Sequence, residues 1–231
     1  PAVTIYSASD NDINEYLEKE NVHLDPKKDL VVIVLREWFM RKNRGLEQAE
    51  NGVSVITSYD DYIEQMAEFG KYVVESDNSN IIFMPMGTLP PCDDRIVLNA
   101  VYERMCDKHV DVSNVFCLSD ITDSRIMTGI MGRAKGVITG RFHGLVYATT
   151  QYVPAIGIAY TEKYYDYYNY IGLSDYVIGM NDLSTEVLIE KYEAMLANTK
   201  EIKAVLEVEI PKQQKNAMKN AELVRDILNK C

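Results

Sequence analysis

The sequence predicts an α/β protein with a Rossmann-like, doubly wound and mostly parallel sheet that has helices on both faces. One observation is that short apolar runs alternate with amphipathic segments through the 231 residues, as in repeated β–α units. A second is that several runs, most clearly Leu30–Leu35, are apolar at every position, which indicates strands buried on both faces of a parallel sheet. Ligands of such sheets bind beyond the carboxyl ends of the strands.

Each predicted element follows from its local pattern. The runs expected to form strands are Val3–Tyr6, Leu30–Leu35, Ile81–Met84, Asn114–Cys117, Gly136–Thr139, Ala155–Ile158 and Tyr176–Ile178. Helices are expected where apolar residues recur three or four positions apart, at Ser58–Ser76, Asp93–Lys108, Ser124–Ala134 and His143–Gln151. A tyrosine-rich helix is expected to start at Lys163.

Two stretches break this alternation. Arg36–Gly52 is polar and irregular, and we expect a surface loop or a lid there. Ser184–Lys230 holds two helical patterns with no strand between them, and the last, roughly Pro211–Asn229, is highly charged. We therefore divide the chain into a Rossmann-like domain, residues 1–183, and C-terminal helices, residues 184–231, that pack on it or on a domain outside this chain. The first residues read as a strand entered within a longer protein.

Composition narrows the classes of function. The net charge of −11 argues against broad binding of nucleic acid or of anionic membranes, because both need basic surface. The four cysteines form no Cys-x-x-Cys pair, so we expect reduced thiols in a cytoplasmic protein and no bound metal or cofactor. No apolar run approaches the ~20 residues that span a membrane.

The most informative stretch follows the apolar run Gly136–Thr139. Read as strand, tight turn and helix, it places Arg141 and His143 where a helix begins. A helix N-terminus offers unpaired N–H groups and a positive dipole end, and glycines such as Gly140 and Gly144 let backbone approach a ligand closely. The alternative is that His143 only caps the helix. The combination favours a site for phosphate or carboxylate.

Other residues are expected at the same edge of the sheet. Arg36 follows the most buried-looking strand, where it either joins the anion site or pairs with an acid such as Glu37 or Asp60. Lys163 is a third cation. The Pro/Gly-rich loop after Ile81–Met84 also lines this edge, and Asp93 or Asp94 is most simply a helix N-cap. No dinucleotide, Walker, serine-hydrolase or zincin motif is present.

In order, these segments resemble the polysaccharide pyruvyl transferases, from about Leu30 to Ile178. The likeness consists of a strand ending in Leu-Arg, a strand ending in Met-Pro, the run Gly-Arg-Phe-His-Gly-Leu-Val-Tyr-Ala, and Val-Pro-Ala-Ile-Gly-Ile-Ala-Tyr-Thr-Glu-Lys. In that family the central motif usually reads Arg-Leu-His, with a later Tyr-x-x-Lys. Phe142 stands here for the leucine, and Tyr160 with Lys163 matches the later pair.

The resemblance implies a GT-B-like enzyme of which this chain is the C-terminal, donor-binding half. It further implies phosphoenolpyruvate as donor substrate, a glycan or lipid-linked saccharide as acceptor, and a pyruvate ketal as product. An N-terminal domain or a homo-oligomer would complete the protein. The residues carried over to donor binding or catalysis are Arg36, Gly140, Arg141, Phe142, His143, Tyr160 and Lys163.

Two questions stay open at this point. His143 is either the general acid of ketal formation or a ligand of the phosphate. The alternatives to a pyruvyl transferase are a GT-B glycosyltransferase with a nucleotide-sugar donor and a non-catalytic anion-binding domain.

Overall fold

The computed structural model describes residues 2–36 and 58–228 and shows the predicted α/β fold. Its sheet is six-stranded and fully parallel, with the strand order β3-β2-β1-β4-β5-β6. The strands are β1 Leu30–Val34, β2 Asn80–Phe83, β3 Val115–Cys117, β4 Gly136–Thr139, β5 Ala155–Ala159 and β6 Val177–Gly179. The helices are α1 Asp10–Lys19, α2 Tyr59–Glu75, α3 Asp94–Asp107, α4 Ser124–Gly132, α5 Phe142–Thr150, α6 Lys163–Ile171, α7 Thr185–Ala197 and α8 Thr199–Leu228.

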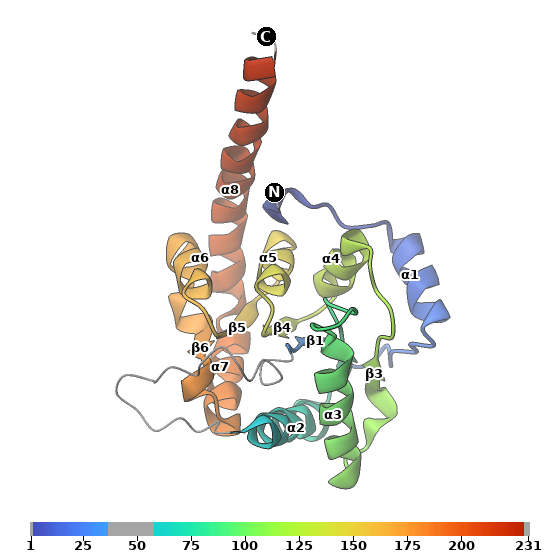
Figure 1. Cartoon of the computed structure of the whole chain (residues 1–231). Coiled ribbons are helices and arrows are strands. Elements are labelled where there is room, and N and C mark those ends of the chain that lie inside the picture. The colour runs from blue at the N-terminus through green and yellow to red at the C-terminus, as the bar shows by residue number, and fades with distance from the viewer. Residues whose placement is uncertain (1, 37–57, 229–231) are drawn as a thin grey trace.

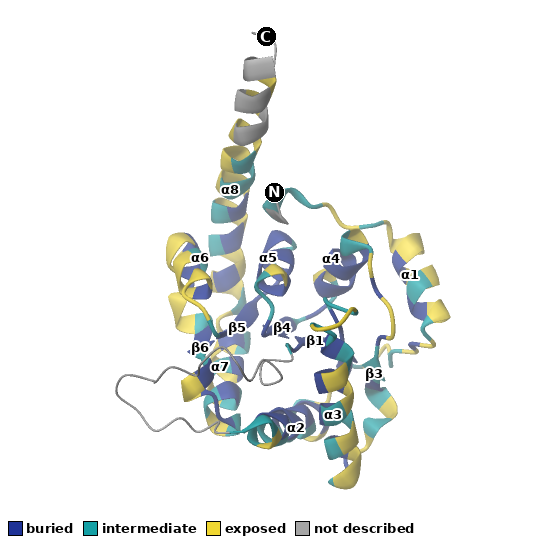
Figure 2. Ribbon diagram, in the orientation of Figure 1, coloured by how far each residue is buried: buried dark blue, intermediate teal, exposed yellow. Residues whose placement is uncertain are grey.

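The helices form one layer on each face of the sheet. In Figure 1, α4, α5 and α6 lie on one face, whereas α2, α3 and α7 lie on the other. The strands and the inner sides of these helices are buried (Figure 2). Every residue of β1 is buried, as a central strand covered on both faces requires. This burial explains why Leu30–Leu35 is apolar at every position.

The order of the strands locates the place where a ligand is expected. The chain passes from β1 toward β2 on one side and later returns to β4 on the other, so the order reverses between β1 and β4. In open α/β sheets the crevice at the carboxyl ends of two such strands is the usual ligand site. Arg36 follows β1 and Arg141 follows β4, so both arginines lie at this crevice.

The strand predicted at Val3–Tyr6 is wrong. Ala2–Thr4 forms a single turn of 3-10 helix, and the residues up to α1 are irregular. The run has β-branched residues, but strand formation requires a neighbouring strand to bond with. The described sheet ends in β3 on one side and β6 on the other, and the N-terminal turn lies instead against α5 and α8.

The last helix starts earlier than predicted, because α8 begins at Thr199 and runs through Pro211. Proline inside a helix removes one backbone hydrogen bond, which leaves the carbonyl four residues earlier, that of Glu207, without its partner. Glu207 lies on the exposed side of the helix, whereas Ile202, Leu206 and Ile210 are buried. This burial holds the helix together through the proline.

Other expectations have mixed outcomes. Helix α1 was not predicted from the sequence, although Ser9 caps it and Ile13 and Leu17 are buried four residues apart. The residues after Arg36 in the expected loop Arg36–Gly52 lie outside the described residues. The division of the chain after residue 183 stays a prediction. None of the described helices has the length and apolar character needed to cross a membrane.

Candidate functional site

The turn between β4 and α5 is held by Thr139. Its hydroxyl accepts a hydrogen bond from the backbone N–H of Arg141 (3.0 Å) and donates one to the carbonyl of Arg141 (2.8 Å). Arg141 is the N-cap residue of α5, without a capping hydrogen bond from its side chain. A Cβ at Gly144 would lie 2.4 Å from the Thr139 Oγ1 atom, so glycine is needed there for α5 to approach this turn. At Gly140 a Cβ would make only ordinary contacts.

Arg141 is held by a buried carboxylate, that of Asp94. Its Nε lies 2.9 Å from Asp94 Oδ2, and its Nη2 donates to Asp94 Oδ1 and to the Cys92 carbonyl. Asp94 is fully buried and also accepts from the backbone N–H groups of Met86 (3.1 Å) and Gly87 (2.9 Å). Burial raises the pKa of Asp94, and the hydrogen bond and charge of Arg141 oppose this rise, while the carboxylate raises the pKa of Arg141 against the effect of burial.

The structure gives different roles to Asp93 and Asp94, which the sequence presented as alternative N-caps of the same helix. The N-cap of α3 is Asp93, which accepts from the Arg95 backbone N–H (3.1 Å), whereas Asp94 turns inward toward Arg141. One edge of the guanidinium is therefore occupied. Arg141 Nη1 donates to no residue in the described parts of the chain and is the nitrogen left for a ligand.

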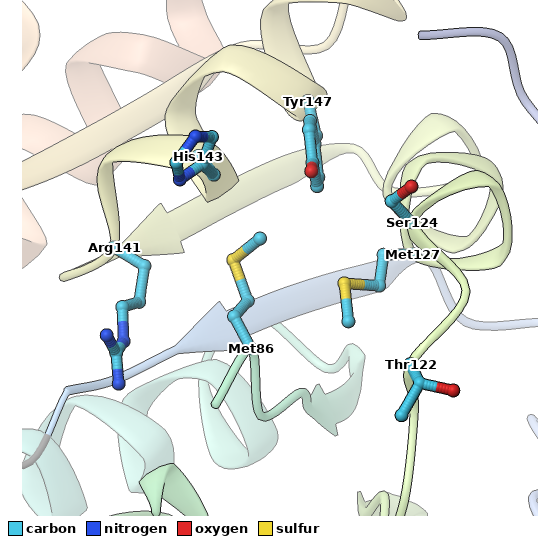
Figure 3. Close-up of a pocket in the computed structure, with 7 residues that line it drawn as sticks. All are labelled: Met86, Thr122, Ser124, Met127, Arg141, His143 and Tyr147. Carbon is cyan, nitrogen blue, oxygen red and sulfur yellow. The ribbon is translucent and has the colours of Figure 1, made fainter. Parts of the chain in front are cut away.

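A pocket of about 250 Å³ lies beside this ion pair. Figure 3 shows His143 and Tyr147, both from α5, on one side and Thr122 and Ser124, from the segment that enters α4, on the other. Met86 and Met127 complete the wall, and Arg141 lies at one end. The sequence patterns did not assign Thr122, Ser124, Met127 or Tyr147 to the site. The available signal was that Thr122 and Ser124 follow a predicted strand, as Arg36 and Arg141 do.

His143 is exposed and faces this pocket without a hydrogen bond to any described residue. Partial burial and the positive charges of Lys163 and Arg141 lower the pKa of His143 below its ordinary value of 6.5. At neutral pH the imidazole is therefore mainly uncharged, and it can accept a proton.

A second group of residues gathers around Tyr160, which follows β5. Arg36 donates to the Tyr160 hydroxyl, and its guanidinium carbon lies 4.5 Å from the centre of the Tyr160 ring. The Lys163 Nζ lies 5.0 Å from the Phe142 ring centre and 5.9 Å from that of Tyr160. We call Arg36, Phe142, Tyr160 and Lys163 the tyrosine cluster.

The structure settles part of the question about Arg36. Asp60, one of the two acids considered as its partner, pairs instead with Arg104 at 2.6 Å. Glu37, the other, lies outside the described residues. Within those residues, neither Arg36 nor Lys163 forms an ion pair with a carboxylate.

Buried aromatic contacts join the tyrosine cluster to the turn before α5. The Tyr164 hydroxyl donates to the Gly140 carbonyl (2.8 Å), and the rings of Tyr160 and Tyr164 lie 5.4 Å apart. Phe142 packs edge-on against Tyr164, with ring centres 5.7 Å apart. All the residues that the sequence assigns to the site thus come together at one edge of the sheet.

Comparison with known proteins identifies the family. The family model described as polysaccharide pyruvyl transferase matches residues 9–162, more than half of the chain. The chain belongs to this family. Curated proteins give no match to its sequence.

The fold of this family member is also similar to several solved structures. UDP-GlcNAc 2-epimerase from Neisseria meningitidis, bound to UDP-GlcNAc, aligns with a TM-score of 0.57 at 12% identity over 95% of this chain and 53% of its own. ADP-heptose lps heptosyltransferase II from E. coli gives 0.55 at 11%, over 85% and 54%. The C-terminal CMP-Kdo binding domain of WaaA from Acinetobacter baumannii gives 0.53 at 9%, over 87% and 96%.

These likenesses show the GT-B-type fold. The chain covers 43%, 43% and 53% of three of the epimerase structures, and thus about half of their length. It covers nearly all of the single domain from Acinetobacter. In residues 2–36 and 58–228, no three histidine, cysteine, aspartate or glutamate side chains are arranged to hold a metal ion.

Proposed function

We propose that this chain binds phosphoenolpyruvate and takes part in moving its three-carbon unit onto two hydroxyls of a saccharide. In the balanced reaction, one hydroxyl oxygen bonds to C2 of the donor while the methylene carbon gains a proton. The C2–O bond to phosphate then breaks, and the second hydroxyl oxygen bonds to C2. Of the two hydroxyl protons released, one ends on the methyl group and the other on phosphate. The products are a pyruvate ketal and inorganic phosphate.

The observation that carries this proposal is the convergence of basic groups at the β1–β4 crevice of a family member. Arg36, Arg141 and Lys163 come from three separate strand ends, and the N-terminus of α5 adds backbone N–H groups and a positive dipole end. Phosphoenolpyruvate carries a phosphate and a carboxylate, and guanidinium groups suit both. This arrangement supports binding of a small molecule with two anionic groups.

The pocket is small compared with the ligands named for proteins that share this fold. The solved structures with a similar fold carry UDP-GlcNAc or are named for ADP-heptose and CMP-Kdo. The pocket here is about 250 Å³, which is below the roughly 300–1,000 Å³ of pockets for drug-sized ligands. A three-carbon unit fits this volume, whereas a nucleotide with an attached sugar would extend well beyond it.

His143 is the group that we assign to proton transfer. It lines the pocket, and its lowered pKa makes it a proton acceptor in the free protein. A bound dianion beside Lys163 offsets part of the positive charge that lowers this pKa. Donor binding therefore raises the proton affinity of His143, and the charged imidazole can deliver a proton to the methylene carbon.

Isothermal titration calorimetry with phosphoenolpyruvate and with UDP-glucose tests the choice of donor. We expect phosphoenolpyruvate to bind and UDP-glucose not to compete. Lys163→Ala should weaken binding at least about tenfold, since a charge-assisted hydrogen bond contributes about 1.5–3 kcal/mol. Lys203→Ala, which removes an exposed lysine of α8, is the matched control and should leave affinity unchanged.

Three results would reject parts of the proposal. Binding of UDP-glucose alone would favour the glycosyltransferase. A loss of affinity in Lys203→Ala equal to that in Lys163→Ala would place the donor elsewhere. Phosphoenolpyruvate bound without release of phosphate, when saccharides with paired free hydroxyls are supplied to the protein, would leave an anion-binding domain.

A further inference from the structure

The basic groups at the crevice differ in whether a carboxylate already balances them. Arg141 forms an ion pair with Asp94, which balances part of its charge, although Arg141 still contributes to the lowered pKa of His143. Arg36 and Lys163 rest on aromatic rings, and no described carboxylate pairs with either. The two ends of the candidate site therefore have different electrostatic character.

The tyrosine cluster holds two positive charges around a single ring. The guanidinium carbon of Arg36 lies 4.5 Å and the Lys163 Nζ 5.9 Å from the centre of Tyr160. Cation–π attraction contributes to holding each cation there, but the ring removes neither charge. Two like charges in one cluster repel each other, and a dianion between them would relieve this repulsion.

The pocket has the opposite character. It offers the free Nη1 of the paired Arg141, a mainly uncharged His143, the hydroxyls of Thr122 and Ser124, and the methionine wall. These groups donate hydrogen bonds and provide apolar surface, and the one cation among them, Arg141, is paired with the Asp94 carboxylate. Such a lining fits a singly charged carboxylate and a methylene group better than a doubly charged phosphate.

We propose that the site orients its donor, with the phosphate at Arg36 and Lys163 of the tyrosine cluster and with the carboxylate and methylene group in the pocket beside Arg141 and His143. This orientation rests on the proposed function, because it takes phosphoenolpyruvate as the donor. It also assigns His143 to proton delivery at the methylene carbon, since His143 lines the half that receives this carbon.

Binding of inorganic phosphate tests the orientation, because phosphate should occupy only the tyrosine cluster and leave the pocket empty. Lys163→Ala disturbs the tyrosine cluster, and Thr122→Phe fills the rim of the pocket from an exposed position. We expect Lys163→Ala to weaken both inorganic phosphate and phosphoenolpyruvate at least about tenfold. Thr122→Phe should weaken phosphoenolpyruvate to a similar extent and change phosphate affinity less than about twofold, because a surface substitution perturbs the fold little.

The opposite pattern would overturn the orientation. If Thr122→Phe weakens inorganic phosphate as much as phosphoenolpyruvate, the phosphate occupies the pocket. If Lys163→Ala leaves phosphate affinity unchanged, the tyrosine cluster is not its site. These results with phosphate are separate from the test of the donor, since a protein that binds phosphate through Lys163 and ignores phosphoenolpyruvate would reject the proposed function alone.

Discussion

Two arginines occupy equivalent places in this fold, one after β1 and one after β4, yet they are held in different ways. Arg141 is 18% exposed and fixed by a fully buried aspartate and a backbone carbonyl. Arg36 leans on the ring of Tyr160 and donates to its hydroxyl. A shared position at the carboxyl edge therefore does not give the two side chains a shared role. Arg141 is a fixed part of the pocket wall, whereas no carboxylate of the described residues balances the charge of Arg36.

The comparison predicts its largest effect in stability. Arg141→Met leaves the Asp94 carboxylate buried without a cation, which should lower the free energy of unfolding by about 3–5 kcal/mol. Arg36→Met removes a cation–π contact and should lower it by no more than about 1 kcal/mol. Urea denaturation followed by circular dichroism at pH 7 measures both values.

A double variant separates charge burial from lost packing. Asp94→Asn combined with Arg141→Met removes both charges and should recover most of the stability lost in Arg141→Met. If Arg141→Met alone does not fold, folding of the double variant would still show that the unpaired Asp94 carboxylate is the cause. Equal losses in the two single arginine variants would mean that the aspartate does not distinguish them.

A smaller effect is expected at the glycines beside the two arginines. Gly144→Ala places a methyl group 2.4 Å from the hydroxyl that holds the Arg141 backbone, and overpacking of this kind costs about 1–3 kcal/mol. In Gly140→Ala the nearest atom, the backbone nitrogen of Arg36, is 3.5 Å away, so we expect a change between zero and a gain of about 1 kcal/mol.

The same denaturation assay checks this pair. Crystal structures of the two variants would show the turn at Thr139 displaced only in Gly144→Ala. A larger loss in Gly140→Ala would mean that the Arg36 side of the crevice is the more tightly packed one.

The sequence predicts the fold and the edge at which the site lies, because both depend on local patterns. Apolar runs place the strands, and Arg36 and Arg141 follow two of them. The partner of Arg141 was not predictable in this way. Asp94 lies 47 residues away, and its simplest local role, the N-cap, is taken by Asp93. A sequence does not distinguish an arginine that pairs with a distant carboxylate from one that has no such partner.

The errors at the two ends of the chain have the same origin. Val3–Tyr6 has the composition of a strand, but the composition does not reveal whether a neighbouring strand is present. Pro211 was expected to mark the start of the last helix, yet burial of Leu206 and Ile210 carries α8 through it. Tertiary packing outweighs local preference in both places.

The smallest effect that we predict is in the protonation of His143. Burial, Lys163 and Arg141 lower its pKa in that order, and Arg36 is not among the causes. Lys163→Ala should therefore raise the pKa of His143, and Arg36→Ala should leave it unchanged. The protein has three histidines, so nuclear magnetic resonance titration resolves their signals, and His143→Gln identifies the relevant one.

The sign of the linked change in stability follows from the same lowered pKa. Below pH 6.5 the unfolded chain binds a proton at residue 143 more readily than the folded protein does. The free energy of unfolding therefore falls slightly as the pH drops from 6.5 through the lowered pKa, and it is unaffected above 6.5. In Lys163→Ala the folded pKa moves toward 6.5, so this contribution should shrink, as it should vanish in His143→Gln. Equal pH dependence in Lys163→Ala and Arg36→Ala would mean that both cations of the tyrosine cluster act on His143 alike, which would contradict the assignment of this effect to Lys163.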